Sequence, residues 1–292
     1  MNEVVVPSPA KVNLFLEVLG RRPDGYHEIE SVLQLIDLCD EVRLRSGPSG
    51  IRLRVTGADL PEGEGNLAYR AAALLLGESR HGGGLEIHLA KRIPLAAGLG
   101  GGSSNAAAVL VGVNRLYGLG WSLAALQQLG ARLGSDVPFF LTDGLALATG
   151  RGELLRPLTP WSPQWLVVAN PGVPVSTAWV YDQASSKLTK DEGHSTIQPL
   201  INDGRLPWPP EWAFNRLEVV VLPSRPEVKA LRDVLVEGGG LPVLMSGSGG
   251  SVFAVMPDAL SAAGLAARVR AGGAFAAAVR TLAANPLLVR GD

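Results

Sequence analysis

The sequence lacks a second cysteine, a strong net charge and any long uninterrupted hydrophobic segment. Its only cysteine, Cys39, cannot form an internal disulfide, which excludes a disulfide-stapled secreted framework. The net charge of −1 gives no overall field that would recruit nucleic acid or an anionic membrane. The longest apolar stretches, 106–126 and 259–279, are interrupted by arginine and are poor membrane spans. The N-terminus lacks the basic region of a signal peptide, so we expect a cytoplasmic protein.

What is present is typical of a compact globule. Of the 292 residues, 47% are apolar and 18% are charged. This length favours two domains, and the change of pattern near residue 160 predicts a division into 1–160 and 161–292.

Residue periodicity predicts a β-rich first half. Alternating apolar and polar residues indicate strands over 12–18, 42–45, 51–56, 85–89 and 144–149. Asp24-Gly25 is a turn signal that predicts a hairpin tip. Helices are expected over 66–78, 104–117 and 122–133, with Asn66 and Ser122 as N-caps.

The residue pattern of the second half predicts alternating helices and strands, as in an α+β sandwich. Strands are expected over 165–170, 242–245, 251–256 and 275–280, and helices over 211–220, 226–237 and 259–271. The polar stretch 185–210 has no periodicity and is interpreted as a surface loop.

A glycine-rich loop, Pro94–Asn105, lies between a predicted strand and a predicted helix. Glycine lets backbone N–H groups approach an anion closely, and the start of a helix presents free N–H groups to it. No Asp or Glu occurs from Ile87 to Ser135, while Lys91, Arg92, Arg115 and Arg132 supply positive charge. The pattern indicates a phosphate-binding loop. The alternative is a tight turn whose glycines serve packing alone.

The loop differs from the common nucleotide motifs. None of the five lysines follows glycine and precedes Ser or Thr, which excludes a Walker A loop. Ser103 stands where a dinucleotide fingerprint needs glycine, and the ribose-binding acid about 20 residues later is missing.

Three separated segments resemble the GHMP-type small-molecule kinases. They are 7–16 with 22–27, the loop 94–105, and 244–253, and their order and spacing cover nearly the whole chain. The resemblance implies an α+β fold with an N-terminal domain like ribosomal protein S5, a ferredoxin-like C-terminal domain and a cleft between them. It also implies ATP carried with Mg²⁺; the sequence shows no dedicated acidic metal site, so we expect the ion to be held mainly by phosphates, water and a loop serine. The residues that it implies for ATP binding are Asn66, Pro94, Leu95, Ala96, Ala97, Gly98, Leu99, Gly100, Gly101, Gly102, Ser103, Ser104 and Asn105.

Lys11 and Asp136 are the catalytic candidates. The resemblance implies that Asp136 is a general base, worth about 10²–10⁴ in rate, and that Lys11 keeps it ionised and stabilises the developing alkoxide. Without the resemblance, Asp136 could equally be a turn or helix-cap residue. The strand pattern places Lys11 on a polar face with Asn13 and Glu17, which is either a solvent face or a cleft wall.

The resemblance also implies a site for a small molecule that carries a cytidyl diphosphate group. Tyr26 and Tyr181 are expected to stack on the two faces of the cytosine, with a hydrogen bond from His27. The substrate-binding residues implied are Asn13, Tyr26, His27, Thr177, Tyr181, Ser246, Gly247, Ser248 and Gly249. The segment 246–250 alone could equally be a tight turn between strands.

Three other functions are compatible with parts of the sequence. The chain could be a GHMP kinase for mevalonate, phosphomevalonate or homoserine; the aromatic pair argues against that. An S5-like RNA-binding module is disfavoured by the net charge. A sensor without activity is disfavoured because Lys11 and Asp136 are both present. We expect no nucleic-acid or membrane partner, and a monomer or weak homodimer.

Overall fold

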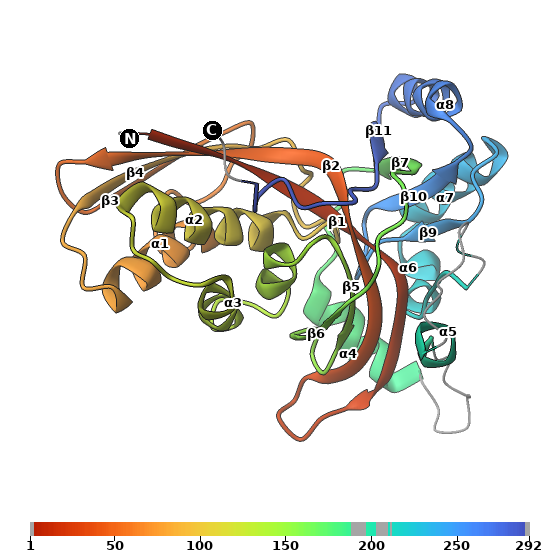
Figure 1. Cartoon of the computed structure of the whole chain (residues 1–292). Coiled ribbons are helices and arrows are strands. Elements are labelled where there is room, and N and C mark those ends of the chain that lie inside the picture. The colour runs from red at the N-terminus through yellow and green to blue at the C-terminus, as the bar shows by residue number, and fades with distance from the viewer. Residues whose placement is uncertain (1–2, 188–196, 203–209, 211, 290–292) are drawn as a thin grey trace.

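A computed structural model describes residues 3–187, 197–202, 210 and 212–289. Two β-sheets lie side by side, each with its own group of helices (Figure 1). The α+β fold with two sheets is therefore confirmed. Among the described residues, no helix is both long enough and apolar enough to cross a membrane.

The first sheet is built around a long hairpin of β1 (Glu3–Arg21) and β2 (His27–Gly47). Its tip is closed by a hydrogen bond from Arg22 N to Tyr26 O of 2.8 Å, as the Asp24-Gly25 signal predicted. The strand order is β3-β4-β2-β1-β8, and β5 pairs with β2 on one side and with β6 on the other. These strands are β3 (Ile51–Thr56), β4 (Gly84–Ala90), β5 (Leu145–Thr149), β6 (Leu154–Pro157) and β8 (Phe214–Asn215).

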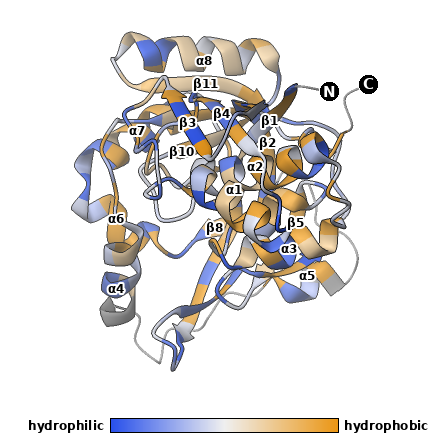
Figure 2. Cartoon of the chain, turned by 90° about the vertical axis from the view of Figure 1, so that its left-hand side faces the viewer, coloured by the Kyte–Doolittle hydropathy of each residue, from blue (hydrophilic) through white to orange (hydrophobic). Residues whose placement is uncertain are grey.

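Three helices and one 3₁₀-helix share a buried hydrophobic cluster with this sheet, and the three helices lie together in Figure 2. They are α1 (Leu67–Glu78), α2 (Gly101–Tyr117), α3 (Leu123–Ala131) and the 3₁₀-helix η1 (Val137–Leu141). Asn66 caps α1 by accepting a bond from Ala68 N, and Ser122 caps α3, as predicted. The helix expected from residue 104 begins earlier, at Gly101.

The second sheet is antiparallel with the order β11-β7-β10-β9. Its strands are β7 (Trp165–Asn170), β9 (Val243–Met245), β10 (Val252–Met256) and β11 (Phe275–Arg280). The helices on this side are α4 (Thr177–Lys187), α5 (Gln198–Asn202), α6 (Glu218–Ser224), α7 (Pro226–Glu237) and α8 (Ala259–Ala271). One buried cluster contains both Val12 of β1 and Phe253 of β10, so the two sheets share a hydrophobic contact.

Two predictions for the second half are wrong in part. The helix expected over 211–220 is replaced by β8, which pairs in parallel with β1, and α6 starts only at Glu218. The surface insertion or loop expected over 185–210 is helical at 185–187, where α4 ends, and at 198–202, where buried Ile197 and Ile201 anchor α5. Residues 188–196 and 203–209 lie outside the described residues.

A register shift in β1 corrects the predicted polar face. The pairing with β2 shifts between Asn13 and Phe15, a β-bulge that puts Leu14 and Phe15 in the same buried cluster. Leu16, instead of Glu17, then continues the cavity face that carries Lys11 and Asn13. Glu17 is fully buried and pairs with Arg216.

Candidate active site

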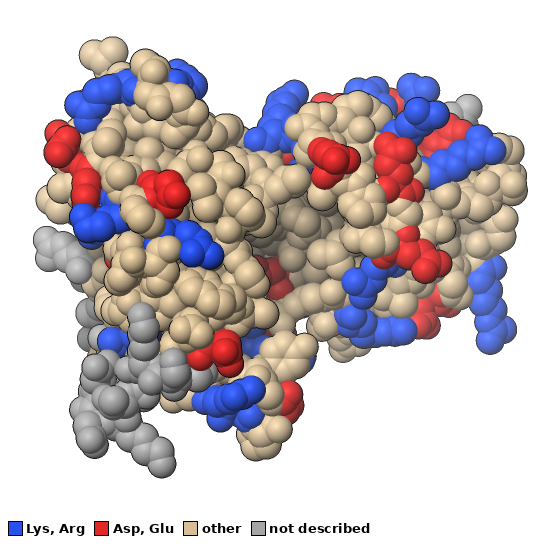
Figure 3. Space-filling model, turned by 180° about the vertical axis from the view of Figure 1, so that it is seen from behind, with Lys and Arg blue, Asp and Glu red and all other residues tan. Residues whose placement is uncertain are grey.

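A cavity of about 1140 Å³ lies between the two halves of the chain. The space-filling view shows it as a hollow (Figure 3). Its walls come from β1, the tip of the β1–β2 hairpin, the glycine-rich loop, the residues before η1 and the start of α4. Most predicted site residues line it; the exceptions are Ser104, Ser246 and Gly249.

The glycine-rich loop ends in a helix start that has no side-chain cap. Gly100 is the N-cap residue of α2, and the first intrahelical bond runs from Ser104 N to Gly100 O at 2.9 Å. The N–H groups of 101–103 therefore lack an intrahelical partner, and these residues line the cavity. A helix start of this kind binds anions such as phosphate.

The loop's glycines are required by backbone angle and by close contacts. Gly98 and Gly100 have φ values of 72° and 70°. A Cβ at Gly98 would overlap the carbonyl oxygen of Ser246, and one at Gly100 would lie 2.7 Å from Cζ of Phe140. At Gly102 the nearest atom, Leu67 Cδ1, would be 3.6 Å away, an ordinary van der Waals contact, so a Cβ would fit there.

A buried polar network fixes the two ends of the loop. The Asp40 carboxylate accepts from Arg92 N (2.7 Å), Ile93 N (2.9 Å) and Asn105 Nδ2 (2.9 Å), and it forms an ion pair with Lys91. Ser104 is fully buried, and its hydroxyl accepts a bond from Ser8 at 2.8 Å. The Ser104 and Asn105 side chains therefore hold the loop in place.

The lack of Asp and Glu from Ile87 to Ser135 does not leave the nearby cations free to attract phosphate. Asp40, brought in from β2, neutralises Lys91 beneath the loop. Arg132 pairs with Glu78 at 2.6 Å, and Arg115 donates to the carbonyl of Leu287 at 2.9 Å. Of the four cations predicted to attract phosphate, only Lys91 lines the cavity. Positive potential at the loop therefore comes from the backbone amides and from Lys11, whose Nζ donates to Gly98 O at 3.0 Å.

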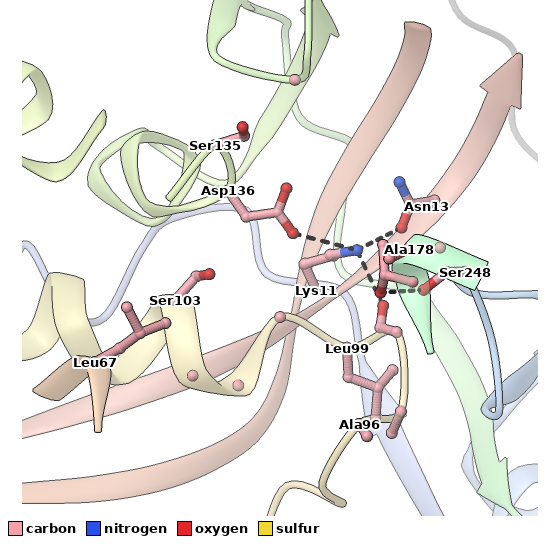
Figure 4. A pocket seen from close by; sticks show the side chains of 18 of the residues that line it. Lys11, Asn13, Leu67, Ala96, Leu99, Ser103, Ser135, Asp136, Ala178 and Ser248 are labelled. Atoms are coloured by element: carbon pink, nitrogen blue, oxygen red, sulfur yellow. Dashed lines mark hydrogen bonds and ion pairs between the residues drawn. The ribbon is translucent and has the colours of Figure 1, made fainter. Parts of the chain in front are cut away.

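Lys11 and Asp136 meet in the cavity (Figure 4). Lys11 Nζ lies 3.8 Å from Asp136 Oδ2 and donates to Asn13 Oδ1 at 2.6 Å and to Gly98 O at 3.0 Å. The Lys11 side chain is 5% exposed and that of Asp136 is 41% exposed. Burial lowers the pKa of Lys11 from its ordinary value, and the charge of Asp136 opposes that shift. The pair offers a fixed buried cation beside a carboxylate that a substrate can reach.

The opposite end of the cavity is aromatic. The rings of His27 and Tyr181 lie 5.2 Å apart, and the Arg151 guanidinium lies 4.6 Å from the ring centroid of Tyr26. Burial raises the pKa of Tyr181 and lowers that of His27, where nearby Arg21 adds to the effect. These two side chains are therefore uncharged hydrogen-bonding and stacking groups near neutral pH.

Arg151 is a site residue that the sequence reasoning missed. It lines the cavity from the turn between β5 and β6, and a Cβ on the next residue, Gly152, would lie 3.8 Å from Asp136 Oδ1. The turn thus runs from Tyr26 to Asp136 and places a cation between the two. No local motif marks Arg151, because its neighbours in the cavity come from distant segments.

The second glycine-rich segment, 246–250, closes one side of the cavity. Ser246 Oγ donates to Gly98 O at 2.9 Å, and the hydroxyls of Ser248 and Thr177 lie 2.8 Å apart. Ser246 is fully buried and contacts the first loop instead of the cavity. The two glycine-rich loops are therefore in direct contact.

Comparisons with known proteins agree with this geometry. Family models described as GHMP kinases N terminal domain and GHMP kinases C terminal match residues 66–144 and 197–274. The 4-diphosphocytidyl-2-C-methyl-D-erythritol kinase of Geobacter sulfurreducens is 44% identical over 284 residues, which is 97% of this chain and 100% of that protein.

Two solved structures place the chain within the fold family. A crystal structure of 4-(cytidine 5'-diphospho)-2C-methyl-D-erythritol kinase matches with a TM-score of 0.81 and 37% identity, over 96% of this chain and 99% of the other. Homoserine kinase from Cytophaga hutchinsonii matches with a TM-score of 0.67 and 21% identity over 97% and 95%, and shares the fold alone. The chain belongs to the GHMP kinases, a family of ATP-dependent phosphotransferases, and within them to the 4-diphosphocytidyl-2-C-methyl-D-erythritol kinases.

Proposed function

We propose that this protein transfers the γ-phosphoryl group of ATP to the 2-hydroxyl of 4-diphosphocytidyl-2-C-methyl-D-erythritol. The products are the 2-phosphate and ADP, and the reaction belongs to non-mevalonate isoprenoid biosynthesis. The observation that carries the proposal is the position of the Lys11–Asp136 pair. It shares one cavity with the uncapped helix start of the glycine-rich loop.

Each group has a defined part in the transfer. The N–H groups of 101–103 bind the phosphates of ATP. Asp136 accepts the proton of the substrate hydroxyl, the oxygen bonds to the γ-phosphorus, and the bond to the β–γ bridging oxygen breaks. Lys11, fixed by Asn13 and Gly98, keeps Asp136 ionised and stabilises the developing negative charge.

Mg²⁺ fits this site as an ion carried mainly by the nucleotide. The described residues contain no group of three or more His, Cys, Asp or Glu side chains that could hold a metal. Ser103, Ser135 and Asp136 are among the oxygen-bearing side chains that line the cavity, and they could complete the ion's coordination. When bound, the ion would neutralise charge on the phosphates.

The aromatic end supports a cytidyl group as the recognised part of the substrate. Tyr26, His27 and Tyr181 provide stacking surfaces and a hydrogen-bonding ring. Arg151, on the path from these rings to Asp136, is placed to contact the negatively charged diphosphate. We further propose that the protein acts in the cytoplasm as a monomer or weak homodimer.

Two measurements test the function. ADP release with Mg-ATP is compared across cytidyl, mevalonate, phosphomevalonate and homoserine acceptors, and only the cytidyl compound should give turnover. NMR of the product should then locate the new phosphate on the 2-hydroxyl. Turnover with mevalonate or homoserine and none with the cytidyl compound would contradict the proposal.

A further inference from the structure

Residues 215–218, Asn-Arg-Leu-Glu, run from the end of β8 to the first residue of α6 and line no part of the cavity. The chemistry proposed above uses none of them. Three of the four side chains nevertheless bind β1, the second glycine-rich segment or Met245, which directly precedes that segment. We call this four-residue stretch the 215–218 clamp.

The clamp holds the start of the 246–250 segment through backbone groups. The buried Asn215 amide donates from Nδ2 to Met245 O at 2.8 Å and to Gly247 O at 2.9 Å, and its Oδ1 accepts from Leu217 N at 2.9 Å. Glu218 Oε1 accepts from Met245 N at 2.7 Å. Both backbone groups of Met245 are therefore bound by clamp side chains. A carboxamide fits position 215 because its NH₂ group donates to two carbonyls while its oxygen accepts, whereas a hydroxyl has a single donor.

The clamp is itself fixed to the strand that carries Lys11. Leu16 of β1 pairs with Asn215 in β8, and Arg216 N donates to Leu16 O at 2.8 Å. The Arg216 guanidinium makes two bonds of 2.8 Å to the fully buried Glu17 carboxylate. A bidentate pair of this kind fixes direction as well as distance.

The far side of the clamped segment touches the catalytic lysine. Gly247 has a φ of 55°, and a Cβ there would lie 3.2 Å from Lys11 Nζ and 3.2 Å from Asn13 Oδ1. The Gly98 carbonyl accepts bonds from both Lys11 and Ser246. A small shift of the segment would therefore move both the wall beside Lys11 and one of its hydrogen-bond acceptors.

We propose that Asn215 and Glu218 are positioning residues that set the location of 246–250 against Lys11, and so the geometry of phosphoryl transfer. This inference rests on the proposed function. We expect ATP binding to depend less on the clamp than the transfer step does, because Asp40 holds the two ends of the first loop through Arg92 N, Ile93 N and Asn105 Nδ2.

The test substitution is Asn215→Asp, which keeps the shape and the acceptor but removes the amide donors facing two carbonyls. We expect kcat/KM for the cytidyl acceptor to fall by about 10- to 100-fold, while the Kd for ATP, measured calorimetrically without acceptor, changes by less than about twofold. The matched control is Asn114→Asp. Asn114 binds both backbone groups of Trp121, at 2.9 and 3.0 Å, and does not line the cavity.

The control should lower the melting temperature and leave kcat/KM unchanged. If Asn215→Asp lowers the melting temperature in the same way and leaves kcat/KM unchanged, the clamp is merely structural and the inference is overturned. Failure of the wild-type protein to use the acceptor would instead overturn the proposed function.

A second pair of variants covers the case in which Asn215→Asp does not fold. Glu218→Gln keeps an oxygen that accepts from Met245 N, so near-normal kcat/KM is expected. Glu218→Ala loses that acceptor, so its kcat/KM should fall while ATP still binds. Equal kcat/KM values for the two Glu218 variants would overturn the inference.

Discussion

The two glycine-rich loops of the cavity, 94–105 and 246–250, share a composition but differ in what they present to the cavity. In the first loop, Gly98 and Gly100 are closely packed, but a Cβ on Gly102 would make only an ordinary contact of 3.6 Å with Leu67 beside the free helix N–H groups. In the second, a Cβ on Gly249 or Gly250 would lie 2.6 Å from Met245 Sδ or 2.9 Å from Val173 O. Glycine therefore serves close packing in both loops, and only the first loop adds a helix start that faces the cavity.

Lys11 lies against both loops. Its Nζ donates to Gly98 O of the first loop at 3.0 Å and lies 3.2 Å from a Cβ built on Gly247 of the second. The free N–H groups of 101–103 belong to the first loop alone. Nucleotide binding by these amides and activation of the acceptor by the Lys11–Asp136 pair are therefore two tasks of different groups.

The largest expected effect separates these two tasks most sharply. Asp136→Asn should lower kcat by about 10²–10⁴ and leave ATP affinity nearly unchanged, because the amides of 101–103 are untouched. Single-turnover kinetics and calorimetry measure the two quantities.

Lys11→Ala combined with Asp136→Asn should be far from additive, since the two side chains act as one unit. Independent, additive losses in kcat would contradict the coupling between them.

A pair of alanine substitutions tests the distinction between close and ordinary packing within the first loop. Gly98→Ala should destabilise the fold by at least about 1–2 kcal/mol, from its positive φ alone, and it also overlaps Ser246. Gly102→Ala lies in a helix, its Cβ would make only an ordinary contact of 3.6 Å with Leu67, and it should fold normally. Chemical denaturation measures both, and equal losses of unfolding free energy would remove the distinction.

A smaller effect is expected at the aromatic end. Tyr181→Ala should raise KM for the cytidyl acceptor, since stacking on a base is worth about 1–3 kcal/mol. KM for ATP should stay nearly unchanged. Initial-rate kinetics with each substrate varied in turn measure the two KM values. An equal rise in both would contradict a role for Tyr181 in binding the cytidyl group.

The most graded effect is a pH dependence. Burial lowers the pKa of Lys11, so kcat should decline at alkaline pH through a value below the ordinary 10.5. The unfolded chain binds more protons than the folded one between these two values, so this group makes stability rise with pH there. A loss of kcat in that pH range therefore cannot come from destabilisation of the fold by the titration of Lys11. A kcat that stays constant up to pH 10.5 would contradict the assignment.

Sequence patterns predicted the elements whose signals are local. The Asn66 cap, the hairpin tip at Asp24-Gly25 and the glycine-rich loop each lie within a few neighbouring residues. Lys11 and Asp136 were assigned only through resemblance, because no local sequence pattern predicts that these two residues are in contact.

What the sequence could not predict depends on contacts between distant segments. The bulge between Asn13 and Phe15 turns Glu17 away from the cavity face, and no residue in this segment predicts a bulge. Asp40 reaches Lys91 from another strand, and Asn215 reaches Met245 across the interface between the sheets. Such polar partners become neighbours only in the tertiary structure, so local sequence patterns do not predict them.

A crystal structure with a non-hydrolysable ATP analogue and the cytidyl acceptor tests the central claim most directly. We expect phosphate oxygens on the N–H groups of 101–103 and the acceptor 2-hydroxyl within about 2.6–3.2 Å of Asp136. A triphosphate bound away from the start of α2, or a 2-hydroxyl far from Asp136, would contradict it.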